Sequence, residues 1–335
     1  MIARLAKLCL VLQVLCVLLP GWLLLSCAGN APRDAGEGDS RETAGQPDRQ
    51  VAGQPSQHFF WKVSDANSSV WLLGSIHFAD SSFYPLDSVI ETAFVNAEEL
   101  AVEIDVTDDS VSTEIASESM QQGMMPAGKR LQDILPPEMW NSIDSICTAW
   151  GFPSMTLQVM RPWLAAMTLS AFAIQRVGID PTLGVDAVLL DRAAHDGKAI
   201  VGLETASEQI GALADTTDSD SAGIFYLKST LREVSELDSM VARIVRAWKT
   251  GDDALLRETM ADERDYDEGT AEKEISDKID EKVYKSRNVK MAERIAEFLS
   301  EDRNVFVVVG AAHLVLDEDN VVDLLRRRGL KVQRY

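Results

Sequence analysis

Two of the four histidines in the chain share one local pattern, in which the histidine lies three residues after a glycine that ends an apolar run. The stretch WLLGSIHFAD contains His77, and the stretch VFVVVGAAHLV contains His313. A glycine at the end of a strand lets the backbone turn sharply and leaves room for a ligand. An imidazole placed there can bind a metal ion or accept a proton.

Two glutamates follow other short apolar segments, Glu103 after LAV and Glu204 after AIVGL. Ligands of open α/β sheets bind beyond the carboxyl ends of the strands, so one pocket could collect these glutamates with His77 and His313. Two histidines with one or two carboxylates suit a divalent metal ion that activates a water molecule. Each residue also has a purely structural interpretation. The histidines could cap strand ends by hydrogen bonds, Glu103 could lie on a solvent-exposed strand face, and Glu204 could cap the helix that follows it.

The elements that would position these residues alternate between strands and helices at both ends of the folded region, which predicts an α/β fold with a helical insertion that caps the sheet. Apolar runs and turn signals predict strands at 59–63, 70–74, 99–105, 198–204, 304–309 and 330–334. Helical spacing predicts helices at 86–98, 138–150, 162–177, 184–195, 206–213 and 318–328, and a long charged helical region over 219–299 with breaks near Gly251 and Gly269.

The first 57 residues are not expected to belong to the fold. Residues 1–26 combine Arg4 and Lys7 with an uncharged apolar run, and Leu-Leu-Ser before Cys27 resembles the bacterial lipobox. We therefore expect a lipoprotein signal peptide and a lipid on Cys27, with a plain membrane anchor as the alternative. Residues 27–57 have the composition of a disordered tether, and residues 58–335 are expected to form a single domain.

Composition narrows the possible functions. A net charge of −21 disfavours nucleic acid as a partner. Cys147 is the one cysteine outside the predicted signal peptide and lipidation site, so no internal disulfide is expected. The chain contains no CxxC, HExxH, phosphate-loop or dinucleotide-binding motif.

Three segments strongly resemble the TraB/GumN family, in the order that the family has them. They are WLLGSIHFADSSFYPLDSVIETAFVNAEELAVEID, GVDAVLLDRAAHDGKAIVGLETASEQI and SRNVKMAERIAEFLSEDRNVFVVVGAAHLV. The resemblance extends from about Phe59 to Tyr335. The paired GxxH motifs, the GLET segment and the RNxxMA helix are specific in combination.

The resemblance implies a metal-dependent hydrolase fold related to the Tiki metalloproteases and, more distantly, to erythromycin esterases and ChaN-like haem-binding lipoproteins, with a mixed central sheet. It implies a divalent ion, Mn, Co or Zn, on His77, His313, Glu103 and Glu204. It also implies that the polar pair Arg287 and Asn288 belongs to the catalytic residues, with the arginine stabilising an oxyanion. After HLV, where many family members have glycine, this chain has Leu316 followed by Asp-Glu-Asp, which puts an inherited substrate preference in doubt.

The leading expectation is a lipid-anchored hydrolase of the bacterial envelope, facing the periplasm from the outer membrane and acting on a peptide or small molecule. One alternative is a lipoprotein that binds a ligand such as haem without hydrolysis, because fold does not fix function. Another is an accessory protein of envelope or polysaccharide assembly in which the histidines are structural.

Overall fold

The computed structural model describes residues 58–217, 219–261, 267, 269–301, 303–316 and 319–335. The predicted signal peptide, Cys27 and the predicted tether lie outside the described residues, as do Asp317 and Glu318 of the expected acidic rim. Within the described part of the chain, no helix has the length and apolar character needed to cross a membrane.

A mixed six-stranded sheet forms the centre of the fold, which confirms the predicted α/β class. The strand order is β4-β3-β5-β2-β1-β6. The four strands from β4 to β2 are parallel, β1 is antiparallel to β2, and β6 is antiparallel to β1. The strands are β1 Phe60–Ser64, β2 Ser69–Ser75, β3 Glu99–Val102, β4 Ala199–Gly202, β5 Val305–Gly310 and β6 Lys331–Arg334.

The register of the parallel strands aligns the chain segments that carry the candidate residues. Val308 of β5 pairs with Val102 of β3 on one side, and its neighbour Val309 pairs with Gly74 of β2 on the other. Val102 in turn pairs with Gly202 of β4. The four carboxyl ends therefore meet at one edge of the sheet, where the chain continues to His77, Glu103, Glu204 and His313.

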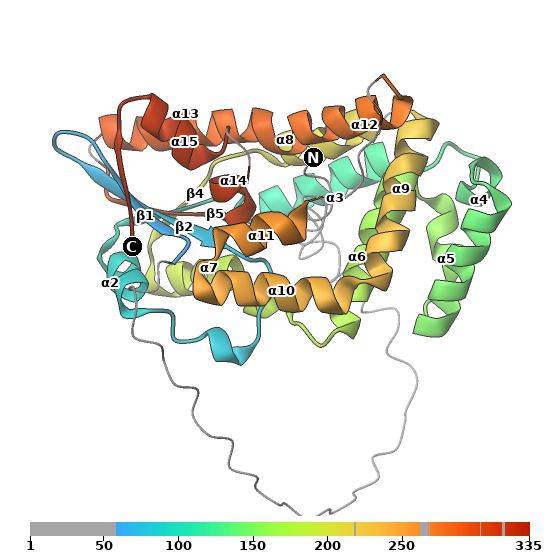
Figure 1. Cartoon of the computed structure of the whole chain (residues 1–335), viewed down its shortest axis with the longest axis horizontal. Helices are drawn as coiled ribbons and strands as arrows, with labels where there is room; N and C mark the ends of the chain where they lie inside the picture. The colour runs from blue at the N-terminus through green and yellow to red at the C-terminus, as the bar shows by residue number, and fades with distance from the viewer. Residues whose placement is uncertain (1–57, 218, 262–266, 268, 302, 317–318) are drawn as a thin grey trace, which may run out of the picture.

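Helices cover the sheet and extend beyond it (Figure 1). In that view the sheet lies between α13 and α15 on one side and α2 and α7 on the other, while α3, α4, α5, α6 and α9 extend away from it. The bounds are α2 Ser88–Asn96, α3 Asp109–Gly123, α4 Leu131–Ile134, α5 Pro137–Trp150, α6 Pro162–Arg176, α7 Val185–Asp196, α8 Ala206–Ala214, α9 Asp220–Ser235, α10 Leu237–Thr250, α11 Asp253–Met260, α12 Ala271–Asp280, α13 Ser286–Ser300, α14 Ala311–Val315 and α15 Val321–Arg327. Four short 3-10 turns, Ser81–Phe83, Ser154–Val159, Pro181–Leu183 and Asp215–Thr217, and a π-helical turn, Glu281–Lys285, complete the assignment.

The central strand β5 shows why the sheet forms here. All six of its residues are buried, as expected for a parallel strand that helices cover on both faces. The side chain of Trp248 on α10 donates its indole N–H to the carbonyl of Gly74 at 2.7 Å and so ties the helical region to the end of β2. Cys147 is free and buried, as expected from its isolation in the sequence.

Several observed elements differ from the predicted ones. The strands expected over 99–105 and 198–204 end earlier, at Val102 and Gly202, so both glutamates lie just beyond their strands. The 15-residue helix α3 was not predicted, because its buried face consists of Ile115, Ser119 and Gly123 and therefore shows no apolar periodicity. The short helix α14, which carries His313, was also not predicted, because its residues continue the apolar run of β5.

Candidate functional site

His77 follows β2 in a buried loop, and its side chain is 3% exposed. Its Nδ1 lies 2.9 Å from Oδ2 of Asp186 on α7. Burial alone would lower the pKa of His77, but the charge of Asp186 and its hydrogen bond raise the pKa above its ordinary value. The Nδ1 contact with Asp186 is an ion pair whose geometry falls outside that of a well-aligned hydrogen bond, and Nε2, on the other side of the ring, is buried without a hydrogen-bond partner.

Gly184 brings Asp186 to His77. A Cβ built at Gly184 would lie 2.7 Å from the carbonyl carbon of His77, so a larger residue would push α7 away. The backbone N–H of Val185 also donates to the carbonyl of Ile76 at 3.0 Å. The first turn of α7 is therefore held against the loop that carries the histidine.

Glu103 is the carboxylate at the centre of the site and is 3% exposed. Its Oε1 accepts the backbone N–H of Gly310 at 2.6 Å, and its Oε2 accepts a bond from Nη2 of Arg287 at 2.7 Å. Burial favours the neutral form, but the nearby charges of His313, Arg287 and His77 and the Gly310 N–H lower the pKa to about 2. Glu103 is therefore ionised at neutral pH.

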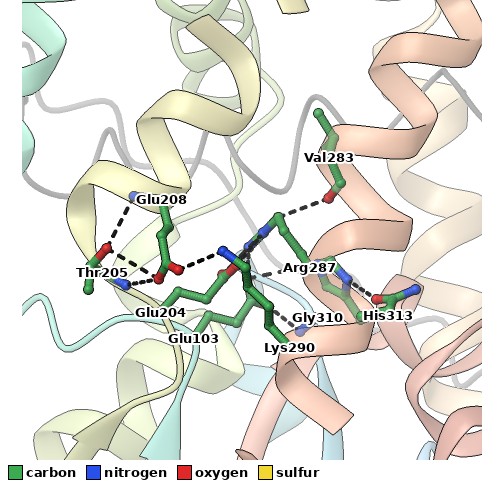
Figure 2. Close-up of polar contacts among 10 residues, drawn as sticks. Glu103, Glu204, Thr205, Glu208, Val283, Arg287, Lys290, Gly310 and His313 are labelled. Atoms are coloured by element: carbon green, nitrogen blue, oxygen red, sulfur yellow. Dashed lines mark hydrogen bonds and ion pairs between the residues drawn. The ribbon is translucent and has the colours of Figure 1, made fainter. Parts of the chain in front are cut away.

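Arg287 joins the two candidate glutamates (Figure 2). Its Nε donates to Glu204 at 2.8 and 3.1 Å, and Nη2 donates to Glu204 at 2.6 Å as well as to Glu103. Its Nη1 donates to the carbonyl of Val283 in the π-helical turn at 3.2 Å. Burial raises the pKa of Glu204 above its ordinary value, and the arginine only partly offsets this effect.

The chain directly after Glu204 is held by hydrogen bonds of its own. Thr205 caps α8, and its side-chain oxygen accepts the backbone N–H of Glu208 at 3.2 Å. Lys290 donates to Glu208 at 2.6 Å (Figure 2). Arg287 holds the two glutamates by hydrogen bonds from Nε and Nη2, and its expected oxyanion-binding role stays a prediction.

His313 lies on α14 and is 2% exposed. Its Nδ1 is 2.7 Å from Oδ1 of Asn288, whose Nδ2 donates to the carbonyl of Asp319 at 3.0 Å. Because the amide nitrogen is used in this way, Oδ1 is the acceptor, and the hydrogen of the neutral ring is on Nδ1. Burial lowers the pKa of His313 to about 3, with an opposing effect from Glu103. Its Nε2 therefore carries a lone pair, 3.9 Å from Oε2 of Glu103.

Gly310 marks the point where the two histidines and Glu103 converge. A Cβ built there would lie 3.4 Å from Oε1 of Glu103, 3.5 Å from Nε2 of His77 and 3.7 Å from Cδ2 of His313. The two rings therefore approach within about 7 Å of each other. A single metal site would be excluded only at a separation above about 10 Å. A glycine at this position leaves the space between them free of a side chain.

The family resemblance implies a divalent ion, and the geometry partly fits one. Both rings direct Nε2 inward while Nδ1 is held by an outer partner, Asp186 or Asn288, which is how metal-binding histidines are usually oriented. Among the described residues, however, no group of three or more His, Cys, Asp or Glu side chains already has a geometry that could hold a metal ion. Both oxygens of Glu103 accept one hydrogen bond each, and each oxygen keeps a second lone pair that could bind an ion.

A cavity of ≈ 680 Å³ opens beside the site, and His77, Glu103 and Asp186 are among its lining residues. The cavity therefore adjoins His77, whose two ring nitrogens are buried. Arg287, Glu204 and His313 do not contribute to its lining.

The structure thus brings all six sequence-predicted residues into one connected network: His77, Glu103, Glu204, Arg287, Asn288 and His313. The network includes Asp186, which sequence reasoning missed. Its one sequence signal is its place two residues after Gly184, at the start of a predicted helix, where an acidic residue is common for other reasons.

Comparison with known proteins gives a consistent result. A profile of the TraB/PrgY/gumN family matches residues 59–334. The chain is 28% identical over 178 residues to the uncharacterized protein YbaP of Escherichia coli (strain K12), an alignment covering 52% of this chain and 63% of YbaP. It is 26% identical over 326 residues to the metalloprotease TIKI1 of Danio rerio, covering 81% of this chain and 63% of that protein. No solved structure shows a significant match.

Proposed function

Because the chain belongs to the TraB/PrgY/gumN family, we propose that it is a metal-dependent hydrolase of amide bonds whose reacting groups are His77, His313 and Glu103. The observation that carries the proposal is their convergence at Gly310, with two inward-facing Nε2 atoms and one ionised carboxylate. The similarity to a protein named as a metalloprotease supports amide bonds of peptides as the target.

The donors available to a divalent ion, Mn, Co or Zn, are Nε2 of His77, Nε2 of His313 and one oxygen of Glu103. When bound, such an ion would act as a Lewis acid on the scissile carbonyl. Glu204, the fourth predicted ligand, accepts hydrogen bonds from Arg287 on both oxygens, and its Oε1 keeps a lone pair that could bind an ion.

The surrounding residues prepare the three reacting groups. Asp186 and Asn288 each hold one ring by Nδ1 and so direct the Nε2 lone pairs to the same space. Arg287 and the Gly310 N–H keep Glu103 ionised, so that it can accept a hydrogen bond from the attacking water. Burial of all three groups excludes bulk water, which strengthens their electrostatic effect on the reacting atoms.

A peptide-hydrolysis assay tests this proposal. The full chain, purified without chelators, would be incubated with a fluorogenic peptide library and each of the three metals. We expect hydrolysis that Glu103→Gln abolishes, while Glu98→Gln, at an exposed position outside the site, retains it. Absence of hydrolysis under every condition, or full activity of Glu103→Gln, would contradict the proposal.

The proposal also includes a lipid anchor at Cys27 that holds the enzyme in the bacterial envelope, facing the periplasm from the outer membrane. The lipobox-like residues before Cys27 support it. We expect a labelled fatty acid to be incorporated into the chain in cells and to be lost in Cys27→Ser. Labelling of the variant, or none of the parent, would contradict the anchor.

A further inference from the structure

The cavity beside His77 extends beyond the residues proposed to carry out hydrolysis. It lies between the segment that follows β3, including Ile104 and Val106, and one face of α7, and it reaches the candidate site at His77 and Glu103. Its volume of ≈ 680 Å³ is within the range of ligand pockets. A substrate that reaches the histidines from this side must place part of itself in the cavity.

Small residues on α7 create the space. Ala187, Leu190, Asp191 and Ala194 all line the cavity and lie on one face, at the three- and four-residue spacing of a helix. Longer side chains at the two alanine positions would project into the space opposite Val106. The wall is apolar over most of its length, which favours burial of an apolar group.

The charged residues that line the cavity limit the charge of the group that can bind there. The ionisable lining residues are Glu103, Asp186, Asp191 and His77, and no lysine or arginine among the described residues lines the cavity. Asp186 already pairs with His77, and Glu103 with Arg287, whereas Asp191 is exposed. An anionic group in the cavity would therefore lie beside Asp191 without a cation in the lining to compensate it.

We propose that this cavity is a substrate subsite that takes an uncharged, apolar side chain of a peptide and rejects an acidic one. The inference rests on the proposed function, since it places that side chain next to the bond presented to His77 and Glu103. It also names two determinants of substrate selectivity. The alanine-lined face of α7 limits the size of the side chain that binds, and Asp191 in the lining disfavours a negative charge on it.

Binding of two matched ligands tests the subsite without relying on hydrolysis. N-acetyl-phenylalaninamide and its para-carboxyphenyl analogue share the ring and differ by one carboxylate. Ligand-observed NMR would follow the titration of each into the full chain in lipid nanodiscs, with empty nanodiscs as the blank. We expect saturable binding of the neutral compound and at least about tenfold weaker binding of the carboxylate.

Substitutions in the wall locate the binding. Ala187→Phe and Ala194→Phe should each weaken binding of the neutral ligand about tenfold or more by filling the cavity. Ala194 is exposed, so its variant remains a test if the other fails to fold. Val95→Phe adds the same ring at an exposed position on α2, outside the cavity, and should leave binding unchanged. Asp191→Asn should reduce the discrimination against the carboxylate.

The outcomes separate this inference from the proposed function. Saturable binding that the two cavity substitutions abolish, with no hydrolysis of any peptide, would support the subsite and contradict the hydrolase. No saturable binding, equal affinity for both ligands, or binding unaffected by both cavity substitutions would overturn the subsite, even if peptides are cleaved.

Discussion

Replacement of Arg287 by methionine tests the role of the buried ion-pair network. The guanidinium is 5% exposed and donates four hydrogen bonds to the carboxylates of Glu103 and Glu204, at 2.6–3.1 Å. Methionine fills much of the same volume without charge or donors. The variant therefore leaves two carboxylates buried at 3% and 6% exposure without their shared cation.

The expected loss of stability is large. Removal of one partner from a buried ion pair typically costs about 3–5 kcal/mol, because the remaining charge is left without compensation. This is a substantial part of the roughly 5–15 kcal/mol by which domains are usually stable. We expect Arg287→Met to lose an amount in this range at pH 7.

The loss should shrink in acid. The folded-state pKa of Glu103, about 2, lies below its ordinary value of 4.5, so its contribution to stability is present above pH 4.5 and is lost as the pH falls toward 2. Without the arginine, burial raises the pKa of both carboxyls, and protonation relieves the penalty as the pH falls. The stabilities of the parent and the variant should therefore converge toward low pH.

Urea unfolding followed by circular dichroism at pH 7 and pH 4.5 measures both effects. Arg287→Met/Glu204→Gln should lose less than the single variant at pH 7, since one uncompensated charge is gone. Arg130→Met, which breaks an exposed pair with Asp133, is the control and should change stability little. A loss below about 1 kcal/mol for Arg287→Met, or an equal loss at both pH values, would refute the reasoning.

Three further changes probe single contacts. Asp186→Asn should lower the pKa of His77, because it removes the charge that raises it; an unchanged NMR titration of that ring would contradict the pairing. Asn288→Asp should raise the pKa of His313 from about 3, because a carboxylate would replace the amide on Nδ1, and the same titration reports it; a pKa that stays near 3 would be contrary evidence. Gly184→Ala should destabilise the fold by about 1–3 kcal/mol in urea unfolding, since its Cβ would lie 2.7 Å from a backbone carbon; an unaltered midpoint would count against this contact.

Gly211→Ala provides the control for the glycine substitution. Gly211 lies within α8, and a Cβ there would have no neighbouring atom within 4 Å. Alanine has a higher helix propensity than glycine, so this variant should be as stable as the parent or slightly more stable.

Much of the sheet and the meeting of its candidate residues could be predicted from the sequence, because one rule connects them. Parallel strands place their carboxyl ends at one edge, so the residues after the apolar runs must lie near one another. This predicts the proximity of His77, Glu103, Glu204 and His313 although more than two hundred residues separate the first from the last. This prediction does not depend on where the helices lie.

The parts that could not be predicted depend on packing between distant elements. Asp186 contacts His77 because Gly184 allows α7 to approach a loop about a hundred residues away, and a helix-start aspartate alone does not indicate that contact. The role of Arg287 likewise depends on its partners. The family resemblance implies an oxyanion-binding role, but the hydrogen bonds of Arg287 to two carboxylates and a carbonyl could not be predicted from the sequence.

The metal content of the purified protein tests the central claim most directly. The full chain, its His77→Ala/His313→Ala variant and a His195→Ala control, which removes an exposed histidine of α7, would each be offered Mn²⁺, Co²⁺ and Zn²⁺ and measured by mass spectrometry. We expect one ion per chain in the parent and the control and none in the double variant, with folding of all three verified by circular dichroism. Equal metal in all three proteins, or none in the parent, would contradict it.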